Sequence, residues 1–336
     1  MNRVASLAVV LLLSSAHSAM AWGAYGHRLI GVCAARSLPD EVPSFLRTDD
    51  SVWNLGELAR EPDRSKGAGS PHDPDLDSGH YVNVGDDGRI AGGPELAALP
   101  RTRAEYETAL RAQGVDSSRF GWLPYSMADG WQQLVKDFAY WRVDRFGAEK
   151  AGTASQRAWF ARDLKLRETL ILRDLGYWSH FVGDAAQPLH VSTHYNAWGD
   201  YPNPNHYTAE RIHTPFEGEF VHRFVLESDV CGSMTPLAAV SGPILAETAS
   251  FIAYSRAQAE PLFAMWTDGG FSSATPQRGK AFAIARLAAG ASELRDLVVA
   301  AWRASPDATV GWPVVKVSAI ESGAAPIPFE AIVGND

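Results

Sequence analysis

The sequence ASQRAWFARDLKLRETLILRDLGYWSHFVGDAAQPLH, residues 154–190, contains one of the longest helical patterns in the chain. Its apolar side chains recur at three- and four-residue spacings, which is the period of one face of an α-helix. These residues are Leu164, Leu170, Leu172, Leu175, Trp178 and Phe181. The spacing predicts a helix over 154–183. Pro188 is expected to end or kink it, because proline has no backbone N–H and clashes with the preceding turn.

Further helical patterns occur on both sides of this segment, separated by long polar loops. They cover residues 26–36, 101–113, 122–146, 237–266 and 276–304. Residues 61–101, rich in Gly, Pro and Asp, predict one long structured loop, and residues 191–212 predict another. The tail from about residue 310 lacks a helical period, so we expect an extended strap. Strand alternation is scarce, which predicts a mainly α protein with a single compact multi-helix domain.

The N-terminus has the three parts of a secretory signal peptide. Arg3 comes first, an apolar run from Leu7 to Leu13 follows, and small residues end the segment at Ala21. We therefore expect cleavage after Ala21, a mature domain over 22–336, and a secreted or periplasmic protein. The apolar run is too short to cross a membrane, and no later stretch reaches the roughly 20 apolar residues that a transmembrane helix needs.

Charge and cysteine content narrow the possible functions. The chain has 30 basic and 39 acidic residues; loss of Arg3 with the signal peptide leaves 29 basic residues and a net charge of −10. This balance disfavours a protein that binds nucleic acid mainly through phosphate charges. The two cysteines, Cys33 and Cys231, form either a long-range disulfide or two thiols, and neither arrangement indicates catalysis.

Two histidine–carboxylate pairs indicate metal binding. His180 and Asp184 are four residues apart on the predicted helix, so they share one face. The proline break lets His190 turn back towards that face. His213 and Glu217 repeat the spacing in IHTPFEGEFVHRF, which also favours a helix. Histidine and carboxylate are ligands that zinc accepts, and two such pairs provide enough of them for a site.

The expected mature N-terminus adds another candidate ligand pair. It reads WGAYGH, with a free α-amine on Trp22 and His27 five residues later. An α-amine has a pKa of about 7.7–8.0, so its neutral form can bind a metal near neutral pH.

These motifs together carry a resemblance. W-x4-H at the mature start, H-x3-D-x5-H with the text GDAAQPLH, and the later H-x3-E are similar to the zinc-dependent phospholipase C and fungal-type single-strand nuclease superfamily. The resemblance extends from Trp22 to about Glu217. It implies a mostly helical domain that binds three zinc ions.

The resemblance also implies a ligand set for each zinc ion. Asp184 would bridge two ions, and Trp22 would bind one of them through its amine and carbonyl groups. The three implied sets are Trp22, His27 and Asp184; His80, His180, Asp184 and one loop acid; and His190, His213 and Glu217.

His80 is matched through the text GHYVNV, and the loop acid must lie before it. Asp63, which is 17 residues before His80, is the expected ligand and, by resemblance, the general base. Other acids of the same loop remain alternatives. These are Glu61, Asp73 and Asp77. The histidines without a counterpart in the family motifs are His72, His194, His206 and His222.

The implied activity is hydrolysis of a phosphodiester by metal-activated water, in a protein that we expect to be a monomer. The H-x3-E motif ending at Glu217 and the acidic net charge favour a phospholipid substrate. The W-x4-H spacing and the 23 residues from His190 to His213 instead resemble nucleases that cleave single-stranded nucleic acid or nucleotides. Arg64, directly after Asp63, differs from the tyrosine in the phospholipases' choline-binding segment. A non-catalytic periplasmic metal-binding protein is the third alternative.

Overall fold

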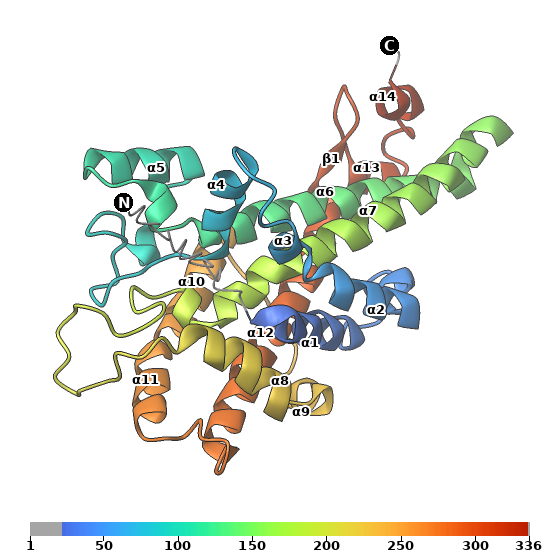
Figure 1. The fold of residues 1–336 in the computed structure, drawn as a ribbon. Coiled ribbons are helices and arrows are strands. Elements are labelled where there is room, and N and C mark those ends of the chain that lie inside the picture. Colours follow the sequence, from blue (N-terminus) through green and yellow to red (C-terminus); the bar gives the residue numbers. More distant parts are fainter. Residues whose placement is uncertain (1–21, 335–336) are drawn as a thin grey trace, which may run out of the picture.

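The computed structural model describes residues 22–334 of the chain, and two long antiparallel helices run through its middle (Figure 1). α6 spans Leu123–Lys150 and α7 spans Ala154–Ala186. Thr153 caps the start of α7, because its side chain accepts a hydrogen bond from the backbone N–H of Gln156. The long helix predicted over 154–183 is therefore confirmed, and it continues for three more residues.

Two glycines of α6 allow the helix pair to approach closely. A Cβ atom at Gly130 would lie 2.0 Å from the Trp178 ring, and one at Gly147 would lie 2.5 Å from the Phe160 ring. Both indicated clashes are with rigid aromatic rings of α7. A side chain at either position would therefore push the two helices apart.

Four more helices pack against this hairpin. α1 (Gly23–Arg36) contacts α2 (Asp49–Leu58), α7 and α12 (Gln277–Ala304), while α10 (Ile244–Arg256) contacts α6 and α7. In Figure 1, α1 and α12 lie beside the C-terminal half of α7. That half of the hairpin is covered on several sides, which removes its side chains from water.

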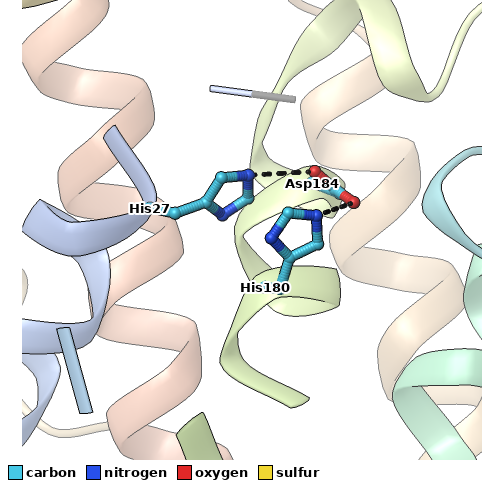
Figure 2. Close-up of side chains that lie close together, drawn as sticks. All are labelled: His27, His180 and Asp184. Carbon is cyan, nitrogen blue, oxygen red and sulfur yellow. Dashed lines mark ion pairs between the residues drawn. The ribbon is translucent and has the colours of Figure 1, made fainter. Parts of the chain in front are cut away.

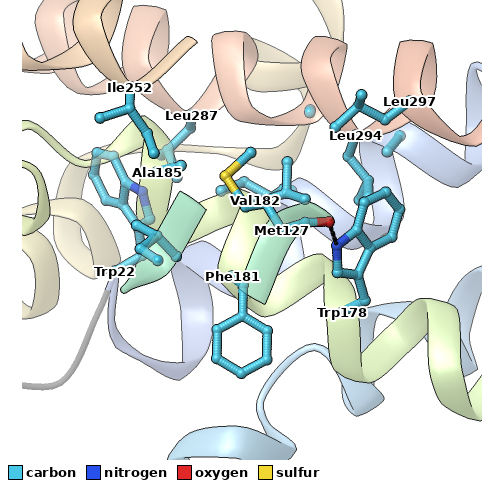
Figure 3. Close-up of a cluster of buried hydrophobic side chains, with 14 of the residues drawn as sticks. Trp22, Met127, Trp178, Phe181, Val182, Ala185, Ile252, Leu287, Leu294 and Leu297 are labelled. Atoms are coloured by element: carbon cyan, nitrogen blue, oxygen red, sulfur yellow. Dashed lines mark hydrogen bonds between the residues drawn. The ribbon is translucent and has the colours of Figure 1, made fainter. Parts of the chain in front are cut away.

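The main apolar core lies between these helices (Figure 3). The members labelled in Figure 3 come from the start of the described chain and from α6, α7, α10 and α12. Figure 3 labels Trp22, Met127, Trp178, Phe181, Val182, Ala185, Ile252, Leu287, Leu294 and Leu297, which are all buried. The indole Nε1–H of Trp178 donates to the Met127 carbonyl at 2.9 Å, so its polar atom is paired inside the core. Burial of a large apolar side chain contributes about 1.5–3 kcal/mol.

A smaller apolar cluster covers the other end of the hairpin. Here the strands β1 (Thr309–Val310) and β2 (Val315–Lys316) form an antiparallel pair, followed by α13 (Val317–Glu321). Val310 and Val317 pack with residues of α6 and α7. The C-terminal segment thus closes the end of the hairpin that α1 and α12 leave open.

The remaining helices are short and connect these parts. They are α3 (Glu61–Arg64), α4 (His72–Asp77), α5 (Arg103–Ala112), α8 (Val221–Phe224), α9 (Glu227–Gly232), α11 (Ala259–Thr267) and α14 (Phe329–Val333). The structure is mainly α, as the sequence predicted.

Several predicted boundaries are wrong, each for a local reason. The expected loop at 61–101 contains α3 and α4, which are too short to show a hydrophobic period. The helix predicted over 237–266 starts only at Ile244, after Pro243, and is interrupted before α11. The expected strap after residue 310 instead contains the strand pair, α13 and α14. The helix α2 was not predicted.

A disulfide joins α1 to α9. Cys33 and Cys231 are 198 residues apart and their Cα atoms lie 5.0 Å from one another. Of the two arrangements that the sequence left open, the structure has the bonded one, which is compatible with an extracellular protein. The expected signal peptide, residues 1–21, lies outside the described residues. Within residues 22–334, no helix combines the length and the apolar character needed to cross a membrane.

Candidate metal centre

The last turns of α7 carry two fully buried polar side chains, His180 and Asp184. His27 of α1 joins them: its ring stacks on the ring of His180 at 3.8 Å, and its Nε2 lies 3.4 Å from Asp184 Oδ1. Figure 2 shows both rings next to the Asp184 carboxylate, with His180 Nε2 3.4 Å from Oδ2. The three side chains can each offer one ligand atom within 4.8 Å of the others.

A second group of ligand atoms lies beside the first and shares His180 with it. Its other members are Asp63 of α3 and His80, at the end of a 3₁₀ turn over Ser78–His80. Asp63 Oδ1 lies 3.7 Å from His180 Nε2 and 4.0 Å from His80 Nδ1. His80 Nδ1 is also 3.1 Å from Asp184 Oδ2, so Asp184 borders both groups.

The third group consists of His190, His213 and Glu217. As predicted, α7 ends before Pro188, and a 3₁₀ turn over Pro188–His190 directs the chain back. His213 Nε2 lies 2.8 Å from Glu217 Oε2, and His190 Nε2 lies 3.8 Å from the same oxygen. Glu217 lies in a π-helical turn, Pro215–Phe220, and not in the α-helix that the spacing favoured.

Unpaired polar atoms show that these groups fit metal ions. Among the described residues, nine buried side-chain atoms of the three groups have no hydrogen-bond partner. They are His27 Nδ1 and Nε2, Asp63 Oδ2, His80 Nε2, Asp184 Oδ1, His190 Nε2, His213 Nδ1 and Nε2, and Glu217 Oε1. A buried polar atom without a partner costs about 1–3 kcal/mol. Cations bound by these atoms would remove that cost.

The hydrogen bonds of two histidines fit the same interpretation. Nδ1 of His180 donates to the Ala59 carbonyl at 2.8 Å, and Nδ1 of His190 donates to the His80 carbonyl at 2.8 Å. Histidines that bind metals commonly donate their second ring N–H to a carbonyl or carboxylate, which leaves the other nitrogen free for the metal.

Protonation in these groups follows from burial and from the surrounding charges. Burial alone would raise the pKa of Asp184, but His180 and His190 hold that pKa well below its usual value. Burial also opposes ionisation of Glu217, yet His213 and His190 lower its pKa to about 2. Burial keeps the pKa of His180 well below its usual value. Ionised carboxylates and a neutral His180 are the forms that bind metals.

His190 differs from His180 in its protonation. Burial would lower its pKa, but Asp184 and Glu217 raise the pKa to about 9. A metal ion at the third group would therefore displace a proton from this ring.

Trp22 lies at the edge of these groups. It is fully buried, and its indole Nε1–H donates to the Gly183 carbonyl at 2.8 Å, next to Asp184. A Cβ atom at Gly23 would lie 3.6 Å from the Glu217 carbonyl oxygen, so the chain passes the third group as well. The Trp22 carbonyl accepts the backbone N–H of Gly26 at 3.1 Å. The cleavage that would expose its amine concerns residues outside the described part.

Of the four acids considered in the loop before His80, Asp63 is the one that the structure brings into a group. Glu61 pairs with Arg64 on the surface, and Asp73 accepts hydrogen bonds from two backbone amides and lies beside His72. Asp77 belongs to none of the three groups. Among the other histidines, His194 is buried but pairs with Asp86, and so it stabilises the loop after His190.

Two residues of the site were missed at the sequence level. Lys66 Nζ lies 2.5 Å from Asp63 Oδ1, and the three-residue spacing between them was a usable indication. Gln187 is fully buried, and its side-chain amide donates to Glu217 Oε2 at 2.9 Å. This contact joins segments 30 residues apart and cannot be read from either one alone.

Comparison with known proteins adds no family assignment: no family model matches the chain, and no curated protein sequence matches it significantly.

Proposed function

We propose that this protein is a secreted, monomeric hydrolase that uses three zinc ions to cleave a phosphodiester. The observation that carries the proposal is that the three groups of potential ligand residues contain nine buried side-chain atoms without a hydrogen-bond partner among residues 22–334. The motif resemblance to the zinc-dependent phospholipase C and single-strand nuclease superfamily supports the choice of metal and reaction. A structural zinc site is usually closed by four protein ligands, often cysteines, whereas these groups contain no cysteine.

The ligands would divide as the motifs imply. Trp22, His27 and Asp184 would hold one ion, and His190, His213 and Glu217 another. The remaining ion would be held by Asp63, His80, His180 and Asp184. Zinc supplies Lewis-acid chemistry in such a site, because it polarises phosphodiester oxygens and makes water more acidic.

The chain's own groups provide the proton acceptor and part of the charge neutralisation. Asp63 Oδ2 has no hydrogen-bond partner among the described residues, and it can accept the proton of the attacking water. Lys66 binds the other oxygen, Oδ1, and so fixes the direction of the carboxylate. Its ammonium group is only slightly exposed and can also neutralise a phosphoryl oxygen that approaches Asp63.

A phospholipid is the preferred substrate in this proposal, on the H-x3-E motif at Glu217 and the acidic net charge. Single-stranded nucleic acid or a nucleotide is the second candidate, favoured by the W-x4-H and His190–His213 spacings. Tyr195, half-exposed and five residues after His190, offers an aromatic face on which a base could stack.

The decisive experiment measures zinc and activity on the same preparation. Mature protein is analysed for bound zinc and assayed on phosphatidylcholine and on single-stranded DNA. We expect close to three zinc ions per chain and hydrolysis of one substrate. One zinc or none would refute the metal centre. Three zinc ions without hydrolysis of either substrate would favour the non-catalytic metal-binding alternative.

Asp184→Asn provides the matched test, with Asp144→Asn as its control. Both aspartates are fully buried on the long helices, but only Asp184 belongs to the ligand groups. We expect Asp184→Asn to lose zinc and at least about 10³-fold in activity, because the loss of several kcal/mol of metal-mediated stabilisation has that effect. Asp144→Asn should keep both. A preparation with one extra residue before Trp22 should also lose activity if the Trp22 amine is a ligand.

A further inference from the structure

Gln187 lies between Asp184 and the third ligand group. It follows the last residue of α7, and its side chain is fully buried. All four of its hydrogen-bonding groups are used. Its backbone N–H donates to the Asp184 carbonyl at 3.0 Å, and its carbonyl accepts the His190 N–H at 3.0 Å. The backbone of Gln187 therefore connects one candidate ligand of the first group to one of the third.

The side chain adds a connection to the π-helical turn. Gln187 Oε1 accepts the Leu189 N–H at 2.7 Å, and Nε2 donates to Glu217 Oε2 at 2.9 Å. The first bond fixes the rotamer of the side chain within the 3₁₀ turn. The second leaves Glu217 Oε1 without a hydrogen-bond partner among the described residues. Both nitrogens of His213 and Nε2 of His190 also lack one, although each Nε2 lies within ion-pair distance of Glu217 Oε2.

An amide suits this position because it donates a hydrogen bond without adding a charge. A lysine or arginine here would neutralise Glu217 and weaken its attraction for a cation. An aliphatic side chain would leave both Glu217 Oε2 and the Leu189 N–H without this partner, at a cost of about 1–3 kcal/mol for each buried group.

We propose that Gln187 is the positioning residue of the third metal site, which holds the Glu217 carboxylate in its ligating orientation relative to His190 and His213. This inference rests on the proposed metal centre. Outer partners of metal ligands typically contribute 10–100-fold to metal affinity. Removal of the Gln187 amide contact should therefore weaken one of the three zinc sites by about 10–100-fold and leave the other two unchanged.

The test titrates zinc from the full mature protein with a competing chelator. Two variants, Gln187→Met and Gln187→Asn, remove the contact in different ways. Methionine keeps the length and loses the polar atoms, whereas asparagine keeps them and is one methylene too short to reach Glu217. Gln132→Met serves as the control, because Gln132 is exposed on α6. We expect both Gln187 variants to release one zinc ion at lower chelator concentration and the control to behave as wild type.

A double-mutant cycle separates positioning from a general structural role. Glu217→Gln should weaken the same single site, and adding Gln187→Asn to it should cause little further loss, because the two residues act through one contact. Additive losses, equal weakening of all three sites, or unchanged zinc release in both Gln187 variants would overturn the inference. If the wild-type protein itself binds fewer than three zinc ions, the proposed metal centre fails instead.

Discussion

The two ends of the α6–α7 hairpin both bury carboxylates, but the pKa of the buried acid is lowered at one end and raised at the other. At the end near α1, Asp184 is surrounded by His27, His80, His180 and His190, and its pKa lies well below the usual value despite complete burial. At the other end, Asp144 of α6 is equally buried, and neither carboxylate oxygen has a hydrogen-bond partner among the described residues.

The difference follows from what faces each acid. Burial raises the pKa of Asp144, and the carboxyl group of Asp163 on α7 raises it further, to about 8, while Arg167 lowers it only in part. Arg167 instead forms an ion pair with Asp137, which lies about two helical turns before Asp144 on α6. Burial penalises a charge wherever it lies, and neighbours of opposite charge, hydrogen-bond donors or a bound cation compensate for it. The end with histidines can bind cations, whereas the end with paired acids retains a proton.

Removal of the proposed zinc ions should have the largest effect, and it should not depend on Asp144 at the other end of the hairpin. A site with free zinc at 1,000 times its dissociation constant stabilises the folded state by about 4 kcal/mol, and three such sites add to roughly 12 kcal/mol. We expect a chelator to lower the thermal unfolding temperature strongly, measured by circular dichroism with and without added zinc. Asp144→Asn should show the same zinc-dependent shift. If the chelator leaves the unfolding temperature unchanged, the histidine end of the hairpin does not bind zinc, and the contrast between the two ends is wrong.

Asp144 gives a pH dependence of stability with the opposite sign to that of a paired acid. Its folded-state pKa of about 8 exceeds the value of 3.8 for an unperturbed aspartate, so the folded state binds this proton more tightly. The stabilisation is complete below about pH 4 and is lost as the pH rises to about 8, at about 1.4 kcal/mol per pH unit and at most about 6 kcal/mol in all.

Asp144→Asn should therefore stabilise the protein at pH 8 and have little effect at pH 4. Chemical denaturation across this range, with zinc present throughout, measures the difference. Asp268→Asn, at an exposed position, is the control and should leave the slope unchanged. Parallel plots of unfolding free energy against pH for wild type and Asp144→Asn would show that folding does not raise the pKa of Asp144. Asp144 would then be ionised in the folded protein across this pH range.

The same contrast shows what the sequence could and could not predict. Helix α7 follows from its own apolar spacing, and the shared face of His180 and Asp184 follows from helix geometry. Asp63 and His80 could be joined to them only by the motif resemblance, because about 100 residues separate His80 from His180. Asp144 and Asp163 carry no motif. Their proximity depends on how two helices pack, which apolar spacing alone does not specify.

The disulfide also belongs to one end, since it ties α1, which carries His27, to α9. Closing a loop of this length typically stabilises a protein by about 2–5 kcal/mol. We expect the double variant Cys33→Ser/Cys231→Ser to lose that amount in urea denaturation. The pH dependence caused by Asp144 should remain, because the disulfide lies away from that end. If the variant loses no stability, the loop is held closed by the helix contacts alone.

Lys66 allows the smallest and most local test, because it separates charge neutralisation from metal binding within the site. Its ammonium contacts Asp63 Oδ1 but is not one of the ligand atoms, so Lys66→Met should retain three zinc ions. A hydrogen bond to a charged group contributes about 1.5–3 kcal/mol, which corresponds to a decrease of roughly 10–100-fold in kcat/KM on the preferred substrate. Lys66→Arg, which keeps the positive charge, should retain more activity, and Lys165→Met on the exposed side of α7 should retain all of it.

If Lys66→Met loses zinc together with activity, then Lys66 acts by holding Asp63 in place for the metal and not by neutralising the substrate. If neither zinc content nor activity changes, the contact has no role in the reaction. The polar network at this end would then consist of metal ligands and their outer partners alone.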